Sequence, residues 1–376
     1  IGILHRVSFE VETVAFLLSG IGVQLLAAYD IEGITTQIVA MMLGVMLFCF
    51  LIWFMSDMDR VAKCRLWIGA GALGLLALTL LIGTGSYGSK NWIHLGPLSV
   101  QPSEFVKIAF IFVGTATLDR LQTKKNFGMA LILFATFLII AFMRSGSIRT
   151  IALVVAGAVL AGLLVLSMKP YILDRFSGWG HVWEHINDDL GYQQTRVLTY
   201  MASGGFFGVG LGNSYLAGVF AADSDLVFGL LCEEQGLLLG LVVLTAFVLF
   251  IFYARSDVTR SRSTFFSIAA CAAAGMLMFQ TALHVYGATD VLPLTGVTLP
   301  FISSGGSSMI SVWGMMAFLK ASDERTYAAR RASRRSQRES APPPRTPAPR
   351  GPSSRTGQTP RPAAPRGGGS WTGQTP

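Results

Sequence analysis

The chain has 376 residues, of which 52% are hydrophobic and 13% are charged, and its formal net charge at pH 7 is +8. A mean hydropathy of +0.54 is too high for an ordinary soluble domain and is typical of a polytopic membrane protein. The positive charge does not indicate a nucleic-acid partner, because the segment from Ala321 onward holds 11 arginines against three acidic residues, and the remainder of the chain is neutral.

Membrane-spanning helices are predicted by runs of about 20 mostly apolar residues. Nine runs approach this pattern, at 11–29, 35–55, 66–84, 104–119, 127–143, 150–168, 227–253, 264–284 and 305–320. The sequence therefore predicts an all-α polytopic membrane protein, with a transmembrane domain over residues 1–325.

Basic residues favour the cytoplasmic side of a membrane, so they assign the loops to the two sides. Lysines and arginines gather at 60–65, 120–125 and 255–262 and in the tail that follows the last span. The loop at 169–226 is then extracytoplasmic. Its length of roughly 58 residues is long for a simple connection and indicates a functional segment.

The number of spans conflicts with these assignments at one place. Two predicted spans lie between the cytoplasmic cluster at 120–125 and the extracytoplasmic loop, where an odd number is required. One crossing is therefore missing or disguised. The glycine-rich run at 201–220 is one candidate for it, and a segment absent between Lys125 and Ala141 is the other.

The C-terminal tail, residues 326–376, has the composition of a disordered segment. It contains 10 of the 15 prolines and repeats the sequence TGQTP. Such a segment cannot bury a core. We expect it to be cytoplasmic and its arginines to contact anionic membrane lipids.

Neither the cysteines nor the histidines form a convincing metal site. The four cysteines are scattered through apolar segments and are expected to be buried free thiols. The sequence HVWEH at 181–185 fits a zinc-protease pattern, but no third ligand is identifiable, so a zinc site is disfavoured.

The connection at 88–107 is unusual for a membrane protein. Pro97 and Pro102 break any helix before the next span, Ser103 suits an N-cap, and Glu104 suits the first turn of a helix. Lys107 lies three residues after Glu104 and can pair with it. A capped helix start with a local ion pair explains these residues about as well as a functional site does.

A second unusual segment, at 292–308, interrupts an apolar region with prolines and glycines. Non-helical backbone at membrane depth is tolerated where it is buried in protein or lines a wet cavity. Its four serines offer hydroxyls to an anionic or polyol ligand: Ser303, Ser304, Ser307 and Ser308. The alternative is a helix-packing face of small residues.

Four carboxylates stand at the start of the long apolar segment after the outer loop. Charged residues at such positions are costly and usually functional. Asp223 and Asp225 lie at the mouth of the span, and Asp223 is a candidate metal ligand. Glu233 and Glu234 lie about two turns deeper, and we expect them to order the helix by pairing with cations or backbone.

Four segments together resemble the SEDS family, the RodA, FtsW and SpoVE proteins of bacterial shape, division and sporulation. They are NWIHLGPLSVQPSEFVK, GYQQTRVLTYMASGGFFGVGLGNS, DSDLVFGLLCEEQGLLLG and LPLTGVTLPFISSGGSS, spread over residues 88–320. The resemblance implies a SEDS fold of ten transmembrane helices, of which about nine are readable here, in the bacterial plasma (inner) membrane. It also implies a peptidoglycan glycosyltransferase that polymerises lipid II beside a class B penicillin-binding protein.

The resemblance also assigns roles to residues. It implies that Asp225 is the catalytic residue. It places substrate binding at two motifs and one further position: Gln101, Ser103, Glu104, Lys107, Arg196, Ser303, Gly305, Gly306, Ser307 and Ser308. Asp223 is the candidate ligand of a divalent metal ion, and no cofactor is firmly implied.

The sequence departs from the family pattern at several positions. Asn91, Arg196, Asp223 and His284 stand where the family usually has Arg, Gln, His and Asn. The family's Q-P-D-x-G-T motif is not found. Either RSGSIRT (144–150) is a degraded version, or the motif and its span are missing between Lys125 and Leu131. The required extra crossing favours the second interpretation.

Three functions remain after these observations. The first is glycosyl transfer, with Asp225 as general base and with Lys107, Arg196 and a divalent metal ion neutralising a pyrophosphate leaving group. The second is a lipid II flippase or transporter, and the third is a non-catalytic scaffold. The sequence does not distinguish a role in elongation from one in division or sporulation.

Overall fold

The computed structural model describes residues 9–83, 92–95, 98–124, 156, 179–188, 191–261 and 263–323. The chain divides into two units, Ile1–Ala332 and Ser333–Pro376, and the described residues all belong to the first. Several sequence expectations lie outside the described residues: the tail, the span at 127–143, nearly all of the span at 150–168, the segment Lys125–Leu131, RSGSIRT and Asn91.

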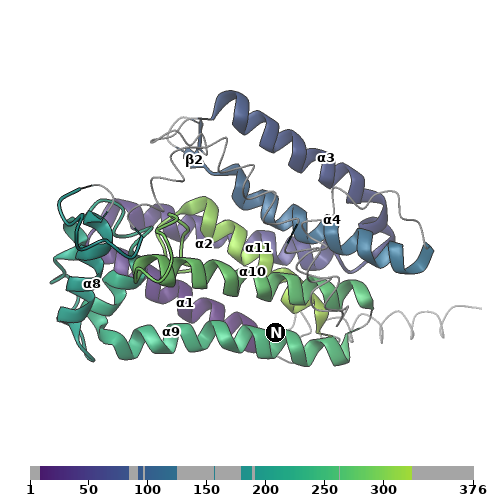
Figure 1. Cartoon of the computed structure of the whole chain (residues 1–376). Coiled ribbons are helices and arrows are strands. Elements are labelled where there is room, and N and C mark those ends of the chain that lie inside the picture. Colours follow the sequence, from purple (N-terminus) through teal and green to yellow (C-terminus); the bar gives the residue numbers. More distant parts are fainter. Residues whose placement is uncertain are drawn as a thin grey trace, which may run out of the picture. The chain divides into compact units, whose positions relative to one another are not determined.

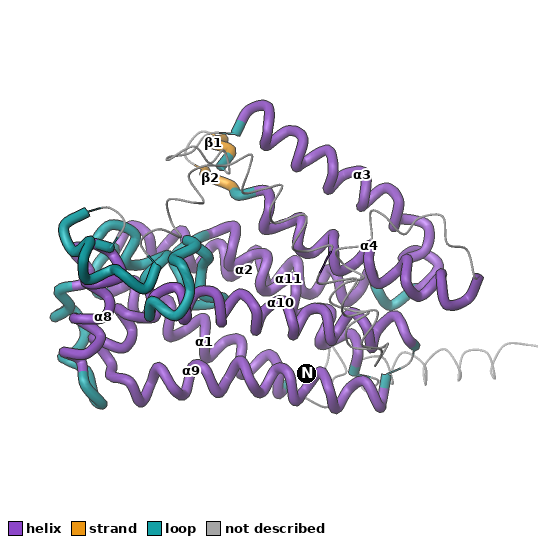
Figure 2. The backbone as a smooth tube through the Cα atoms, viewed as in Figure 1, coloured by secondary structure: helices purple, strands orange, loops and turns teal. Residues whose placement is uncertain are grey.

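Helices dominate the described part of the chain (Figures 1 and 2). Its N-terminal half contains α1 (Glu10–Ala27), α2 (Ile31–Phe54), α3 (Met58–Ile82), β1 (Ile93–Leu95), β2 (Leu98–Val100) and α4 (Pro102–Lys124). Its C-terminal half contains α8 (Tyr192–Gly204), the 3₁₀ turn η1 (Leu216–Gly218), α9 (Val227–Arg260), α10 (Thr264–Ala288) and α11 (Gly306–Ser322). The two strands form a short antiparallel hairpin before α4.

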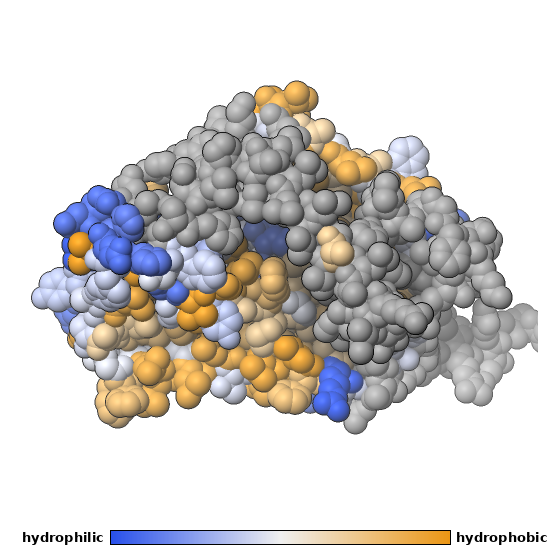
Figure 3. Space-filling model, viewed as in Figure 1, coloured by the Kyte–Doolittle hydropathy of each residue, from blue (hydrophilic) through white to orange (hydrophobic). Residues whose placement is uncertain are grey.

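The predicted all-α fold is confirmed. Every predicted span that falls wholly within the described residues, or nearly so, coincides with a helix. Five helical segments there are long and apolar enough to cross a membrane: Glu10–Ala27, Gly33–Phe54, Met58–Thr79, Val227–Ser256 and Thr264–Ala288. Hydrophobic residues gather where α9 runs, and hydrophilic residues gather at the end where the outer loop lies (Figure 3).

Helix α3 begins eight residues before the predicted span. Asp57 accepts a hydrogen bond from the Asp59 backbone N–H and so caps the helix. Arg60 pairs with Asp57 at 3.2 Å. The basic cluster at 60–65 therefore lies on the first turns of a helix rather than in a loop.

Helix α11 forms the centre of the core and contacts α1, α2, α4, α9 and α10. Its Trp313 is buried against the rings of Phe16, Phe48 and Phe301. A Cβ atom on Gly44 of α2 would stand 2.9 Å from the Trp313 Cβ, so the absent side chain permits this close approach. Lys320, at the far end of α11, pairs with Glu12 of α1 at 3.2 Å in the buried interior.

The outer loop is bonded to α9 at a break in that helix. Gly236 has φ +87°, and on either side of it the loop supplies backbone partners: Val209 N–H donates to the Glu233 carbonyl, and Leu237 N–H donates to the Gly205 carbonyl. Gly208 and Gly236 leave no room for a side chain, because a Cβ atom on either would lie 2.1 Å from backbone of the other segment.

This pairing decides what the glycine-rich run at 201–220 does. The deepest backbone bond between the run and α9 is at Leu238, whose N–H donates to the Phe206 carbonyl. After this bond the chain leads back to Leu226, directly before α9. The stretch from Val227 to Leu238 rises about 17 Å, well short of the roughly 30 Å of a bilayer core. Of the two candidates for the missing crossing, the glycine-rich run is therefore ruled out.

Candidate functional site

Asp225 lies in a tight turn directly before α9. The N–H groups of Asp225 and Leu226 both donate to the Ala221 carbonyl, at 2.9 and 3.2 Å, and Ala221 has φ +59°. The Asp225 side chain is half-buried. Its Oδ2 atom lies 3.1 Å from where a Cβ on Gly296 would stand, so the carboxylate rests against the backbone of the 292–308 segment. The structure thus joins two segments that the sequence marked separately.

Ser303 fastens these two segments together. Its hydroxyl donates to the Ser224 carbonyl at 2.6 Å and accepts from the Leu299 N–H at 2.7 Å. The Ser304 N–H donates to the Asp223 carbonyl at 2.9 Å. The buried Ser303 hydroxyl is therefore committed to backbone groups, and its contribution to the site is to hold the turn that carries Asp225.

A polar network crosses the interior between α4, α10 and α11. Lys107 pairs with Glu104 at 2.8 Å, which confirms the predicted contact between their side chains. Lys107 Nζ also donates to Gln280 Oε1 at 3.0 Å, and the Ser311 hydroxyl donates to Glu104 Oε2 at 2.7 Å. Buried charges of this kind need several partners. The sequence did not indicate Gln280 or Ser311, which lie within apolar helical segments.

The network continues into the segment before α11. Gln280 Nε2 donates to the Thr298 carbonyl at 2.9 Å and lies 3.2 Å from the Thr298 hydroxyl. The Thr298 hydroxyl lies 2.9 Å from that of Ser308, and the Gln101 N–H donates to the Ser307 hydroxyl at 3.4 Å. The structure thus brings together the two predicted substrate-binding motifs.

Glycines open α11 beside α2. The Gly305 N–H donates to Gln37 Oε1 at 3.3 Å, and Gln37 Nε2 donates to the Ser303 carbonyl at 3.2 Å. Gly306 is the first residue of α11. Both glycines therefore lie at a helix N-terminus, a position that suits an anion, although the Gly305 N–H is already bonded to Gln37.

Two predicted residues have different surroundings from those expected. Ser103 is not an N-cap: α4 begins at Pro102, whose ring suits the first helical position, and Ser103 is the exposed second residue. Arg196 stacks over Tyr192 on its own helix, with 5.1 Å between the guanidinium carbon and the ring centroid. The described contacts do not draw Arg196 into the network that contains Lys107.

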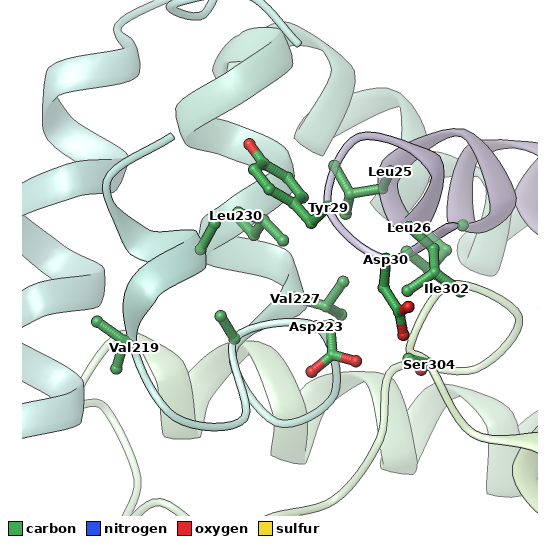
Figure 4. Close-up of a pocket in the computed structure, with 13 residues that line it drawn as sticks. Leu25, Leu26, Tyr29, Asp30, Val219, Asp223, Val227, Leu230, Ile302 and Ser304 are labelled. Carbon is green, nitrogen blue, oxygen red and sulfur yellow. The ribbon is translucent and has the colours of Figure 1, made fainter. Parts of the chain in front are cut away.

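A pocket of about 230 Å³ lies beside Asp223 (Figure 4). Its apolar wall comes from α1, from the start of α9, from the end of the outer loop and from Ile302. Its polar lining consists of Tyr29, Asp30, Asp223 and Ser304. In Figure 4, Asp30 and Asp223 lie on the same side of the pocket, with Ser304 beside Asp30. Asp30 also caps α2 by accepting from the Gly33 N–H at 2.9 Å.

The fit of this pocket to a divalent cation can be tested against its donors. Among the described residues, no three His, Cys, Asp or Glu side chains gather closely enough to hold a metal ion. Mg²⁺, however, is commonly held by one or two carboxylates together with substrate phosphates. Asp30 and Asp223 suit that mode, so Asp223 as a ligand stays a prediction, with Asp30 as an added candidate.

The HVWEH sequence shows no zinc-like arrangement. Residues 182–187 form turns, His181 Nδ1 lies 3.2 Å from the Trp179 carbonyl, and His185 Nδ1 lies 3.2 Å from Asp188. Each imidazole thus has a local partner in the outer loop.

Glu233 and Glu234 hold the outer loop. Glu233 accepts from the Ser214 hydroxyl and from the N–H groups of Tyr215 and Leu216, at 2.9 and 3.1 Å. Glu234 accepts from the Gly212 N–H at 3.0 Å. Both carboxylates bind backbone, as one of the two sequence expectations stated, but they order the loop rather than the helix.

Comparison with known proteins places this arrangement in a family. A family model described as cell cycle protein, for FtsW, RodA and SpoVE, matches residues 13–126 and 120–327. The two matched segments overlap at 120–126, beside the place where the count of spans requires a missing crossing.

Named relatives match over much of the chain. The probable peptidoglycan glycosyltransferase FtsW of Tolumonas auensis is 34% identical over 68% of this chain and 75% of its own length. Stage V sporulation protein E of Bacillus subtilis is 32% identical over 62% of this chain and 72% of its own length. The peptidoglycan glycosyltransferase RodA of Mycobacterium bovis is 26% identical over 81% of this chain and 76% of its own length.

Solved structures share the fold. A chain of a peptidoglycan synthase complex that coordinates polymerization and crosslinking matches with a TM-score of 0.65 at 22% identity, over 85% of this chain and 98% of its own. The rod shape determining protein RodA of Thermus thermophilus matches with a TM-score of 0.56 at 22% identity, over 84% of this chain and 95% of its own. The chain belongs to the FtsW/RodA/SpoVE family of multi-pass membrane proteins.

Proposed function

We propose that this protein is a peptidoglycan glycosyltransferase that polymerises lipid II into glycan strands. The observation that carries the proposal is the placement of the Asp225 carboxylate against Gly296, where the outer loop meets the segment that leads into α11. The names of the relatives support the reaction class, and they include proteins of division, shape and sporulation.

Asp225 acts as the general base in this proposal. The 4-hydroxyl of the acceptor sugar attacks the anomeric carbon of the donor and forms the new glycosidic bond. The bond from that carbon to the lipid pyrophosphate breaks, and the pyrophosphate leaves with the electron pair. Asp225 takes the hydroxyl proton, and a single displacement inverts the anomeric carbon.

The leaving pyrophosphate needs positive charge. Lys107 is suited to supply it, because its side chain is 22% exposed while Glu104 and Gln280 hold it in place. Arg196 is a second candidate cation. Asp223 and Asp30 would hold a divalent cation if one is used, and such an ion supplies charge neutralisation to phosphate oxygens.

Asp225→Asn tests the proposal, because it removes the base and preserves side-chain size. We expect polymerisation of purified lipid II to fall at least about a hundredfold. Asp188→Asn, in the same outer loop, is the matched control and should polymerise normally. Normal strands from the Asp225 variant would overturn the assignment. Movement of labelled lipid II across liposomes without polymer would indicate a flippase, and the absence of both activities would indicate a scaffold.

The cellular setting forms part of the same proposal. The protein resides in the bacterial inner membrane, with its transmembrane domain at 1–325 and a cytoplasmic tail at 326–376. Its partner is a class B penicillin-binding protein, which would crosslink the strands; the match to a synthase complex supports this pairing. Co-purification with such a partner tests it, and labelling of the tail from the outer face of intact cells would contradict the topology.

A further inference from the structure

We propose that Gln280 is a positioning residue that holds Lys107 in the orientation needed for the lipid pyrophosphate. This inference rests on the proposed function and adds a residue that neither the sequence motifs nor the family resemblance singled out. It follows from the hydrogen-bond partners of the oxygen and the nitrogen of the buried Gln280 side-chain amide.

The amide of Gln280 is fully engaged between two segments. Gln280 is 4% exposed and lies in α10. Its oxygen accepts from Lys107 Nζ at 3.0 Å, and its nitrogen donates to the Thr298 carbonyl at 2.9 Å. An amide supplies an acceptor and donors on one planar group, whereas an apolar side chain of similar size supplies neither.

Lys107 is held from two sides and still has capacity for a ligand. An ammonium group has three donors. Glu104 takes one at 2.8 Å, from one turn earlier on α4, and Gln280 takes another from α10. Glu104 is itself fixed by the Ser311 hydroxyl. Among the described contacts, the third donor is left for an anionic oxygen.

Gln280 also connects this cation to the segment that touches Asp225. Thr298, which accepts from the Gln280 amide, is two residues after Gly296, and the position where a Cβ on Gly296 would stand lies 3.1 Å from Asp225 Oδ2. Lys107 and Asp225 are therefore both positioned by one short stretch of backbone, residues 296–298. Correct relative placement of reacting groups accounts for a large part of enzymatic rate enhancement.

Two substitutions separate positioning from simple packing. Gln280→Leu removes the acceptor that holds Lys107, so the lysine should become mobile. Gln280→Glu retains an acceptor and adds a charge, so Lys107 should be held more tightly. Both variants lose the N–H that donates to the Thr298 carbonyl, so they differ only in how they hold Lys107. Gln194→Leu is the matched control, because Gln194 is likewise 4% exposed and its amide donates to a backbone carbonyl, that of Gly287, at 2.9 Å.

The first measurement is the acylation rate of the Lys107 amine by mass spectrometry in the full-length protein, with exposed Lys63 as internal reference. We expect the rate to rise in Gln280→Leu and to fall in Gln280→Glu. A purely structural role would move both variants in the same direction, and that result would overturn the proposal. Unchanged Lys107 acylation rates in both variants would also overturn the proposal.

The second measurement is lipid II polymerisation and lipid II binding. We expect Gln280→Leu to raise KM about tenfold, the usual scale for losing a hydrogen bond to a charged group, with a smaller change in kcat. In a Lys107→Ala background, Gln280→Leu should weaken lipid II binding no further. Additive losses of binding would contradict action through Lys107.

Failure of this inference is distinguishable from failure of the proposed function. A wild-type protein that makes no polymer would sink the proposed function, whereas the Lys107 acylation rates would still report on positioning. A wild-type protein that polymerises lipid II, together with variants that match it in KM and in Lys107 reactivity, would sink this inference alone.

Discussion

The Oδ2 atom of Asp225 lies 3.1 Å from the point where a Cβ atom on Gly296 would stand, and Gly296 has φ +65°. Glycine is therefore required there both for its backbone conformation and for the space that the carboxylate occupies. The absent side chain at Gly296 therefore leaves the space that the Asp225 carboxylate occupies beside the segment that leads into α11.

Gly296→Ala should displace the Asp225 carboxylate. We expect polymerisation to fall by about tenfold, because the new Cβ would push the carboxylate aside by a few tenths of an ångström, and a misplacement of 1 Å costs about a hundredfold. Gly212→Ala provides the control: Gly212 also has positive φ, +77°, but a Cβ there meets nothing within 4 Å. Equal activity losses in the two variants would show that backbone strain, and not the contact with Asp225, is responsible.

Gly208→Ala should detach the outer loop from α9. Its φ is +82°, and a Cβ would lie 2.1 Å from the Glu234 carbonyl oxygen. We expect faster proteolysis within 204–218 and a lower midpoint of thermal unfolding. Gly205→Ala, with φ +56° and open space around the Cβ, should resist proteolysis better. Identical cleavage rates in the two variants would contradict the close packing of the loop on α9.

Lys320→Met should leave the Glu12 charge in a buried interior. The two side chains pair at 3.2 Å, and Lys320 is 1% exposed. Removal of one partner of a buried pair costs about 3–5 kcal/mol of unfolding free energy. The double variant Glu12→Gln, Lys320→Met should recover much of that loss in thermal unfolding of the purified protein. A single variant as stable as wild type would refute this role for the pair.

Asp223→Asn and Asp30→Asn should weaken binding of a divalent cation at the pocket of Figure 4. We expect the Mg²⁺ concentration for half-maximal polymerisation to rise about tenfold in either variant. Asn remains a good N-cap, so Asp30→Asn should preserve the start of α2. Polymerisation that is unaffected by chelators in the wild type would remove the metal from the proposal.

The helices were predictable because their signal is local. A run of apolar residues long enough to cross a bilayer becomes a helix wherever it lies, since lipid offers no partners to backbone groups. The predicted spans at 227–253 and 264–284 accordingly lie within α9 and α10. Boundaries were less predictable: the cap at Asp57 starts α3 ahead of its apolar run, and Pro102 displaces Ser103 from the cap of α4.

Topology of the outer loop was not readable from composition. The glycine-rich run at 201–220 was one of two candidates for the missing crossing. In the folded protein its glycines allow the loop to bond to α9 around Gly236 and to return to the same end of the helix. A crossing and a loop that returns can have the same glycine composition. Which of the two forms depends on backbone hydrogen-bond partners that lie far apart in the sequence.

The sequence by itself determined the class of the protein, its apolar helices and the ionisable residues that stand at costly positions among them. It also predicted the Glu104–Lys107 pair, because that pair depends on helical spacing alone. Tertiary structure decided which of these residues meet. Gln280 carries no local signal, and nothing in the sequence singled out Gly296 within its segment, yet Gln280 binds Lys107 and Gly296 leaves space beside the Asp225 carboxylate. A hydrogen bond and a steric contact each depend on distances of a few ångströms, and those distances exist only once α4, α10 and the segment before α11 have packed together.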